Sequence, residues 1–206
     1  MMQTRFWLIR HALVAEHERA RLYGVRDVTL CQESLLSDGP AYRALAAQLP
    51  RPAVWGCTPL SRTRLTAEAI FAAGYPAQGL FVEPGLIEQN LGALQGLDRD
   101  TVPAQLTMAP HPFWPLAATE VPQDGESVAQ LLDRVGATME QLAEAHRGQD
   151  IVIVSHGGAI RAAVGHAMGV DAQAILHLSI QNLSLTRLDR MAEGWKVDCV
   201  NQVTVS

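Results

Sequence analysis

Three short apolar runs along the chain carry the pattern of buried strands. They cover residues 5–9 (RFWLI), 53–57 (AVWGC) and 151–155 (IVIVS). The third run is almost entirely β-branched, which is typical of a strand in the middle of a parallel sheet, where both faces are covered. We therefore expect these runs to form strands of one buried sheet.

A helical pattern follows each of these runs at some distance. The segment from Ser37 to Leu49 begins with a capping residue and has a proline in its first turn. The segment 59–74 ends at a glycine, which suits the position after a helix. The segment 126–148 carries a row of apolar residues on one helical face: Val128, Leu131, Leu132, Val135, Met139 and Leu142. A further helical segment, 158–169, directly follows the third strand.

Strands that alternate with helices predict an α/β fold, here a three-layer α/β/α sandwich around a mostly parallel sheet with right-handed crossovers. The tail from 183 to 200 contains two strand-like runs, which we expect to form a closing hairpin or edge strands. At 206 residues the chain has the length of one ordinary domain with a buried core. We therefore predict a single domain over residues 1–206.

The alternation of strands and helices breaks at about 97–125. This stretch carries the aromatic pair Phe113 and Trp114 and the prolines Pro103, Pro110, Pro112, Pro115 and Pro122. Two interpretations are equally compatible with an insert of this kind: a lid over the active site, or an ordered loop that packs on a hydrophobic patch.

Composition and charge narrow the class of protein. The formal net charge is −5 and the pI is near 5.8, so we do not expect a surface that binds nucleic acid. No stretch approaches the roughly 20 apolar residues of a membrane span, and no N-terminal signal pattern is present. The 3 cysteines form no CxxC pair, which argues against a disulfide framework and a structural zinc site. We expect a cytoplasmic protein.

Polar residues follow each predicted strand at its carboxyl end. They are Arg10 and His11 after the first strand, Thr58 and Arg62 after the second, and Ser155, His156, Gly157 and Gly158 after the third. In parallel α/β sheets, ligands bind outside the carboxyl ends of the strands. Two arginines, two histidines and the N-terminus of the following helix therefore predict a pocket for a small, doubly charged anion, most obviously phosphate.

A series of motifs in fixed order extends this interpretation. The motifs are LIRHA (8–12), CTPLSRTRLTAEAI (57–70), LIEQNLGALQG (86–96), DGESVAQLLDRV (124–135) and IVIVSHGGAIRA (151–162). Their order and spacing, over about residues 5–190, resemble those of the histidine phosphatase superfamily, the phosphoglycerate-mutase-like family. The resemblance implies a phosphoglycerate-mutase-like fold and a phosphatase that works without a metal or another cofactor.

The resemblance also implies catalytic roles for individual residues. His11 is the expected nucleophile, which becomes phosphohistidine, and His156 is the second histidine of the catalytic pair. Glu88 is the expected proton donor to the leaving group and afterwards the base that activates water. Glu83 lies close in sequence and is the alternative acid.

A second set of residues is expected to bind the phosphoryl group. The resemblance assigns its oxygens to Arg10, Arg62, His156 and the backbone at Gly157. His17 stands where many family members have a phosphate-contacting Asn, so it is a candidate phosphate donor, with an ordinary surface histidine as the alternative.

Other positions depart from the family pattern or receive no catalytic role. The glycine that usually follows Arg-His is Ala12, and the next two positions, Leu13 and Val14, lack the usual polar side chains. Arg161 and His166 lie on the helix that follows the third strand, and we interpret both as non-catalytic.

The charge of the insert helps to distinguish a mutase from a phosphatase. Mutases of this family carry an insert rich in Arg and Lys, whereas between Glu88 and Glu126 this chain has Arg99 as its single cation. We therefore expect a phosphatase for a small phosphomonoester with an uncharged or partly apolar body. The alternatives are a phosphoglycerate-mutase-type phosphotransferase and a non-catalytic protein that binds a phosphorylated ligand. The sequence identifies neither the substrate nor whether the chain forms a homodimer.

Overall fold

The computed structural model describes residues 3–203 of the chain, so the first two and last three residues of the predicted domain lie outside the described part. Its strands are β1 (Thr4–Arg10), β2 (Val54–Cys57), β3 (Leu80–Val82), β4 (Asp150–Ser155), β5 (Leu185–Met191) and β6 (Gly194–Gln202). They form one 6-stranded sheet in the order β3-β2-β4-β1-β5-β6. β1 to β4 pair in parallel, and β5 and β6 run antiparallel to their neighbours. The predicted mostly parallel α/β fold is confirmed.

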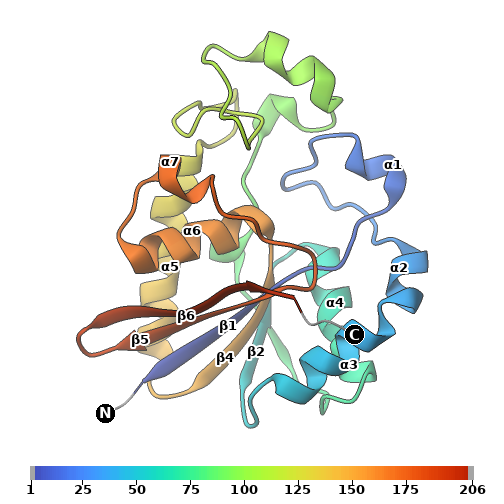
Figure 1. Cartoon of the computed structure of the whole chain (residues 1–206), viewed down its shortest axis with the longest axis vertical. Helices are drawn as coiled ribbons and strands as arrows, with labels where there is room; N and C mark the ends of the chain where they lie inside the picture. The colour runs from blue at the N-terminus through green and yellow to red at the C-terminus, as the bar shows by residue number, and fades with distance from the viewer. Residues whose placement is uncertain (1–2, 204–206) are drawn as a thin grey trace.

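Helices cover both faces of this sheet (Figure 1). The α-helices are α1 (Glu16–Arg19), α2 (Gln32–Ser37), α3 (Gly39–Gln48), α4 (Ser61–Ala72), α5 (Val128–Ala145), α6 (Gly157–Met168) and α7 (Ala172–Ile175). The 3-10 helices are η1 (Pro84–Leu86), η2 (Gly92–Leu94) and η3 (Arg99–Gln105). α3 and α4 pack on one face and α5 and α6 on the other, as the predicted three-layer sandwich requires. Within residues 3–203 no helix combines the length and the apolar character needed to cross a membrane.

Strand β4 contributes side chains to the two hydrophobic cores, one on each face of the sheet. Successive side chains of a strand point to opposite faces. Ile151 and Ile153 accordingly pack with α5 and α6, while Val152 and Val154 pack with α3 and α4. All of these side chains are fully buried, and burial of a side chain of this size contributes about 1.5–3 kcal/mol to folding. The sheet that carries the candidate site is therefore a rigid platform.

Helix α5 follows its apolar pattern closely. The predicted face is buried at Val128, Leu131, Val135, Met139 and Leu142, and Leu132 is partly buried beside it. The start of the helix is fixed by a capping box, in which Ser127 and Gln130 each accept a hydrogen bond from the other's backbone N–H. This cap lies next to the candidate site.

The sequence pattern did not predict two short elements, α2 and β3. Ser37 does not cap the predicted helix but ends α2, and the following helix begins at Gly39 with Asp38 before it. The two helices follow one another so closely that the capping signal falls inside the first. Strand β3 has only 3 residues at the sheet edge, with Val82 57% exposed, so it carries no periodic signal.

The insert shares a small apolar core with the segments around Leu22 and Leu91, beyond the carboxyl ends of the parallel strands (Figure 1). This core consists of Leu22, Leu91, Leu94, Val102 and Leu116, with Leu97, Leu106 and Trp114 packed against it. The insert thus covers a hydrophobic patch, and its action as a lid remains a prediction.

Candidate active site

The strands that were expected to deliver site residues, β2, β4 and β1, are neighbours in the sheet. Their carboxyl ends lead into Thr58, His156 and His11, and each of these side chains is at most 2% exposed. The imidazole ring centroids of His11 and His156 lie 5.3 Å apart in an edge-to-face arrangement. The structure therefore brings the two predicted histidines together, as a parallel sheet should.

The orientation of His11 exposes one ring nitrogen for chemistry. Its Nδ1 lies 2.7 Å from the carbonyl oxygen of Ala12. A carbonyl only accepts hydrogen bonds, so Nδ1 carries the proton and Nε2 keeps its lone pair. The backbone of His11 is held by Asn182, whose side-chain amide donates to the His11 carbonyl oxygen at 2.8 Å. This is the tautomer that a nucleophilic histidine needs.

Burial and neighbouring cations keep both imidazoles neutral. Burial, followed by the charges of Arg62 and Arg10, lowers the pKa of His11 well below its usual value, and the carbonyl of Ala12 opposes this only in part. Burial and then Arg62 likewise lower the pKa of His156 well below its usual value. A neutral His11 at neutral pH retains the lone pair that an attack on phosphorus requires.

Arg62 is a fixed, fully buried cation under the two histidines. Its terminal nitrogens donate to the carbonyl oxygens of Gly24 at 2.8 Å and Arg26 at 2.7 Å. The guanidinium also lies over the ring of Tyr23, with 5.3 Å between Cζ and the ring centroid. Burial lowers the pKa of Arg62, but an arginine remains charged, so the site carries a permanent positive charge.

Three buried nitrogens of the predicted phosphate-binding residues have no hydrogen-bond partner within the described chain: Nε of Arg10, Nε of Arg62 and Nδ1 of His156. Other nitrogens of Arg10 and His156 have partners. Arg10 donates to the carbonyl oxygen of Ile180 at 2.5 Å, and Nε2 of His156 lies 2.8 Å from the hydroxyl of Thr58. Because buried polar groups are rarely left without partners, these nitrogens mark a place for an anion.

Glu88 lines a cavity together with Arg10 and Gly157, and Glu83 does not. The Glu88 carboxylate accepts the backbone N–H of Gln89 at 3.0 Å and of Gly158 at 3.2 Å, and it lines a cavity of about 190 Å³. Glu83 instead caps η1, where its carboxylate accepts the backbone N–H of Gly85 at 2.8 Å, and it does not line the cavity. The geometry therefore favours Glu88 as the acid.

The model of the histidine phosphatase superfamily (branch 1) matches residues 6–203. The chain belongs to this superfamily. The motif-based resemblance to the histidine phosphatase superfamily is therefore confirmed over almost the whole chain.

Relatives of this histidine phosphatase carry both phosphatase and mutase names. A metal-independent phosphoserine phosphatase of Arabidopsis thaliana is 30% identical over 93% of this chain and 81% of its own length. A probable phosphoglycerate mutase GpmB of Serratia proteamaculans is 29% identical over 96% of this chain and 93% of its own. A solved mycobacterial glucosyl-3-phosphoglycerate phosphatase has a TM-score of 0.80 at 22% identity, covering 97% of this chain and 99% of that one. The last likeness shows the shared fold.

The structure does not bring His17 of this histidine phosphatase to the other candidates. His17 lies on α1 with its side chain 75% exposed, and its Nε2 is 3.6 Å from the carboxylate of Glu18. It does not line the cavity, whereas Tyr23 and Gly24, a few residues later, do. Gly157, the other predicted phosphate contact, lines the cavity at the start of α6.

Arg161 is a cavity residue that the sequence interpretation set aside. Its Nε donates to the carbonyl oxygen of Leu178 at 2.7 Å, and its guanidinium lies over the ring of Trp114, with 4.8 Å from Cζ to the ring centroid. Arg161, Trp114 and Arg99 all line the cavity. One helical turn separates Arg161 from Gly157, and this i,i+4 spacing is the signal that could have placed both on the same helix face.

Gly158 offers a test of the position of Glu88. A Cβ built on Gly158 would overlap Oε1 of Glu88. The end of a glutamate side chain can move aside, so Gly158→Ala should fold normally but displace the carboxylate. We expect its kcat on alkyl phosphates to fall by roughly tenfold or more, because a misplaced catalytic group costs about that much. Steady-state assays beside thermal unfolding would check this, and an unchanged kcat would contradict the close approach.

The insert contains a contact that depends on pH. His111, which is 6% exposed, packs edge-to-face on His177, with ring centroids 4.9 Å apart, and its Nδ1 accepts the backbone N–H of Phe113. Burial and then His177 lower the pKa of His111 below 6.5. The unfolded insert therefore binds the proton more readily, so the stability that this contact contributes decreases as the pH falls below 6.5.

We expect limited proteolysis within residues 97–125 to accelerate on acidification. In His111→Gln this acceleration should be smaller, since the titrating group is gone. Equal acceleration in the variant and the wild type would remove His111 as the cause.

Proposed function

We propose that this histidine phosphatase hydrolyses small phosphomonoesters through a phosphohistidine on His11. The observation that carries the proposal is the buried pair of imidazoles. Nε2 of His11 keeps its lone pair, the ring of His156 packs beside it, and buried nitrogens of His156 and of the nearby Arg10 and Arg62 have no partner within the described residues. A phosphoryl group is the anion that matches both features, because it offers an electrophilic phosphorus and several oxygens that accept hydrogen bonds.

In the first step, Nε2 of His11 attacks phosphorus and the bond from phosphorus to the ester oxygen breaks. Arg10, Arg62 and His156 share the charge that spreads over the phosphoryl oxygens in the transition state. Glu88 gives its proton to the departing alkoxide, which leaves as an alcohol. The product of this step is the phosphoenzyme with an ionised Glu88.

In the second step, water attacks the phosphohistidine. Glu88 takes a proton from this water, the bond from phosphorus to Nε2 breaks, and inorganic phosphate leaves. The enzyme returns to its starting state with a protonated Glu88 and a neutral His11. Every proton transfer in this cycle uses Glu88, and no step requires a metal.

The cavity suggests which leaving groups the enzyme accepts. Arg161 and Arg99 line it together with Trp114, so it offers cations beyond those assigned to the phosphoryl group. This differs from the uncharged substrate that the insert predicts, because Arg161 lies on α6, outside the insert. We propose a substrate whose leaving group carries a carboxylate beside a short aliphatic body, because an arginine guanidinium binds a carboxylate through paired hydrogen bonds.

The proposal on the leaving group predicts a preference within a matched pair of compounds. O-phosphoserine and O-phosphoethanolamine differ by one carboxylate, and we expect kcat/KM to be at least about tenfold higher for O-phosphoserine, the worth of one charge-assisted hydrogen bond. Arg161→Gln should remove most of this preference by raising KM for O-phosphoserine alone. Equal kcat/KM values in the wild type would contradict the carboxylate.

The first experiment tests the reaction itself. Release of inorganic phosphate from p-nitrophenyl phosphate would be measured with EDTA present. Continued turnover in EDTA supports a metal-independent phosphatase. Transfer of the phosphoryl group to an added alcohol or phosphorylated acid without release to water would favour a mutase. Thermal stabilisation by phosphate without any turnover would indicate a binding protein.

A further inference from the structure

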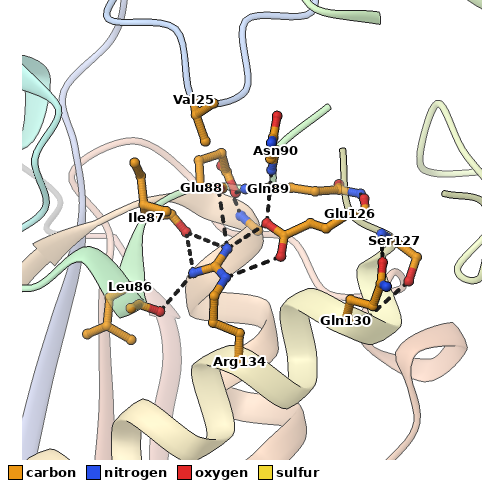
Figure 2. Close-up of polar contacts among 12 residues, drawn as sticks. Val25, Leu86, Ile87, Glu88, Gln89, Asn90, Glu126, Ser127, Gln130 and Arg134 are labelled. Carbon is orange, nitrogen blue, oxygen red and sulfur yellow. Dashed lines mark hydrogen bonds and ion pairs between the residues drawn. The ribbon is translucent and has the colours of Figure 1, made fainter. Parts of the chain in front are cut away.

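Arg134 on α5 and Glu126, just before the same helix, form an ion pair beside the main chain that carries Glu88 (Figure 2). Nη2 of Arg134 lies 2.6 Å from Oε1 of Glu126, and Nε lies 3.2 Å from Oε2. The two side chains are 28% and 17% exposed, respectively. A bidentate pair that is partly shielded from water has a defined geometry, unlike most surface ion pairs.

The guanidinium of Arg134 also binds the main chain of the residues that precede Glu88 in the sequence. Its Nη1 donates to the carbonyl oxygen of Gly85 at 2.8 Å. Nη1 and Nη2 both reach the carbonyl oxygen of Ile87 at 3.3 Å, and Nη2 lies 3.5 Å from the carbonyl oxygen of Glu88 itself (Figure 2). One side chain thus fixes the path of the backbone from residue 85 to residue 88.

Glu126 binds the main chain and side chains of the residues that follow Glu88 in the sequence. Its Oε1 accepts the backbone N–H of Asn90 at 2.9 Å, and its own N–H donates to the carbonyl oxygen of Asn90 at 2.8 Å. The side-chain amide of Gln89 donates to the carbonyl oxygen of Glu126 at 2.9 Å. Because the capping box of Ser127 and Gln130 fixes the start of α5, Glu126 is itself held in place (Figure 2).

Glu88 has little else to hold it. Among residues 3–203, its carboxylate accepts hydrogen bonds from two backbone N–H groups, those of Gln89 and Gly158. The carboxyl must nevertheless stand within reach of the leaving oxygen, and a catalytic group that is off by about 1 Å loses much of its effect. The position of the carboxyl therefore depends on the backbone that Arg134 and Glu126 hold from both sides.

We propose that Arg134 and Glu126 are positioning residues for the proton donor Glu88, and that they act on the leaving-group step without touching the substrate. The proposal rests on the proposed function, in which Glu88 protonates the leaving oxygen. It assigns a role in catalysis to an ion pair that sequence order alone would leave as a feature of a helix start.

The test uses the dependence of the rate on the leaving group. In Arg134→Gln we expect kcat on an alkyl phosphate to fall by about tenfold or more, and kcat on p-nitrophenyl phosphate by less than about threefold, because the aryl leaving group departs without a proton. KM should change little for either compound. A loss of equal size on both compounds would overturn the proposal, since it would indicate a general defect.

A double-mutant cycle shows whether Arg134 acts through Glu88 or independently of it. Once Glu88→Gln has removed the acid, Arg134→Gln should cause no further loss that is specific to the alkyl phosphate. A specific loss of full size in the double variant would overturn the proposal, because Arg134 would then act independently of Glu88. Arg147→Gln removes a matched exposed ion pair, that of Arg147 with Glu144, and should leave both activities unchanged.

Two further variants keep the test valid if Arg134→Gln folds poorly. Glu126→Gln retains an acceptor for the N–H of Asn90 but removes the charge, and Arg134→Lys retains the pair but loses the contacts to several carbonyls. In both variants kcat should again fall more on the alkyl phosphate than on p-nitrophenyl phosphate, but by a smaller factor than in Arg134→Gln. A wild type without turnover would instead refute the proposed function, and Glu88→Gln without alkyl selectivity would refute the acid, so each failure is distinguishable.

Discussion

His11→Ala is expected to abolish phosphate release, with a fall in kcat of at least about 10⁴-fold, because loss of a nucleophile removes the covalent route entirely. The remaining cations still bind phosphate, but the variant lacks the imidazole whose Nε2 keeps a lone pair because its Nδ1 donates to the carbonyl of Ala12. Nε2 of His156 is engaged by the hydroxyl of Thr58 at 2.8 Å. The assay is phosphate release over long incubation, paired with rapid quenching and detection of acid-labile phosphoenzyme in the wild type.

The matched control for this variant is His146→Ala. His146 follows α5 near the amino end of β4, where its ring stacks on Phe81 with 5.7 Å between centroids. It should retain the wild-type kcat. If His11→Ala turned over at a rate close to that of His146→Ala, or if the wild type formed no phosphoenzyme, His11 would not be the nucleophile.

Glu88→Gln is expected to lower kcat on alkyl phosphates by about 10²–10³-fold and on p-nitrophenyl phosphate by less than about tenfold. The amide cannot donate a proton of useful acidity, so the variant depends on leaving groups that depart as anions. The fold should survive, because the glutamine side chain has the same size and its amide oxygen still accepts one of the two backbone N–H groups, of Gln89 or of Gly158.

The measurement is kcat/KM across a series of phosphomonoesters whose leaving alcohols differ in pKa. The slope against leaving-group pKa should be steep in Glu88→Gln and shallow in the wild type. Glu83→Gln is the matched control, since Glu83 caps η1 away from the cavity. A steep slope in Glu83→Gln and a shallow one in Glu88→Gln would reverse the assignment of the acid.

Much of the framework follows from the sequence alone. The apolar face of α5 has a helical period, and the short apolar runs of β1, β2 and β4 have the length of strands, with β-branched residues throughout β4. Residues placed directly after strands, such as His11 and His156, had to meet, because parallel strands end at the same edge of the sheet. The order of the motifs then indicated the family, which the comparison confirms.

Tertiary structure decided what depends on partners far apart along the chain. Arg62 is held by the carbonyls of Gly24 and Arg26, and Arg161 meets the cavity only because Trp114 of the insert lies on it. Arg134 fixes the backbone of Glu88 from 46 residues away. Every residue has a backbone carbonyl, so the residue types do not indicate which carbonyls accept these hydrogen bonds, and no sequence pattern could predict them. The residue types needed for chemistry are thus determined locally, whereas their positions within the site are determined by packing.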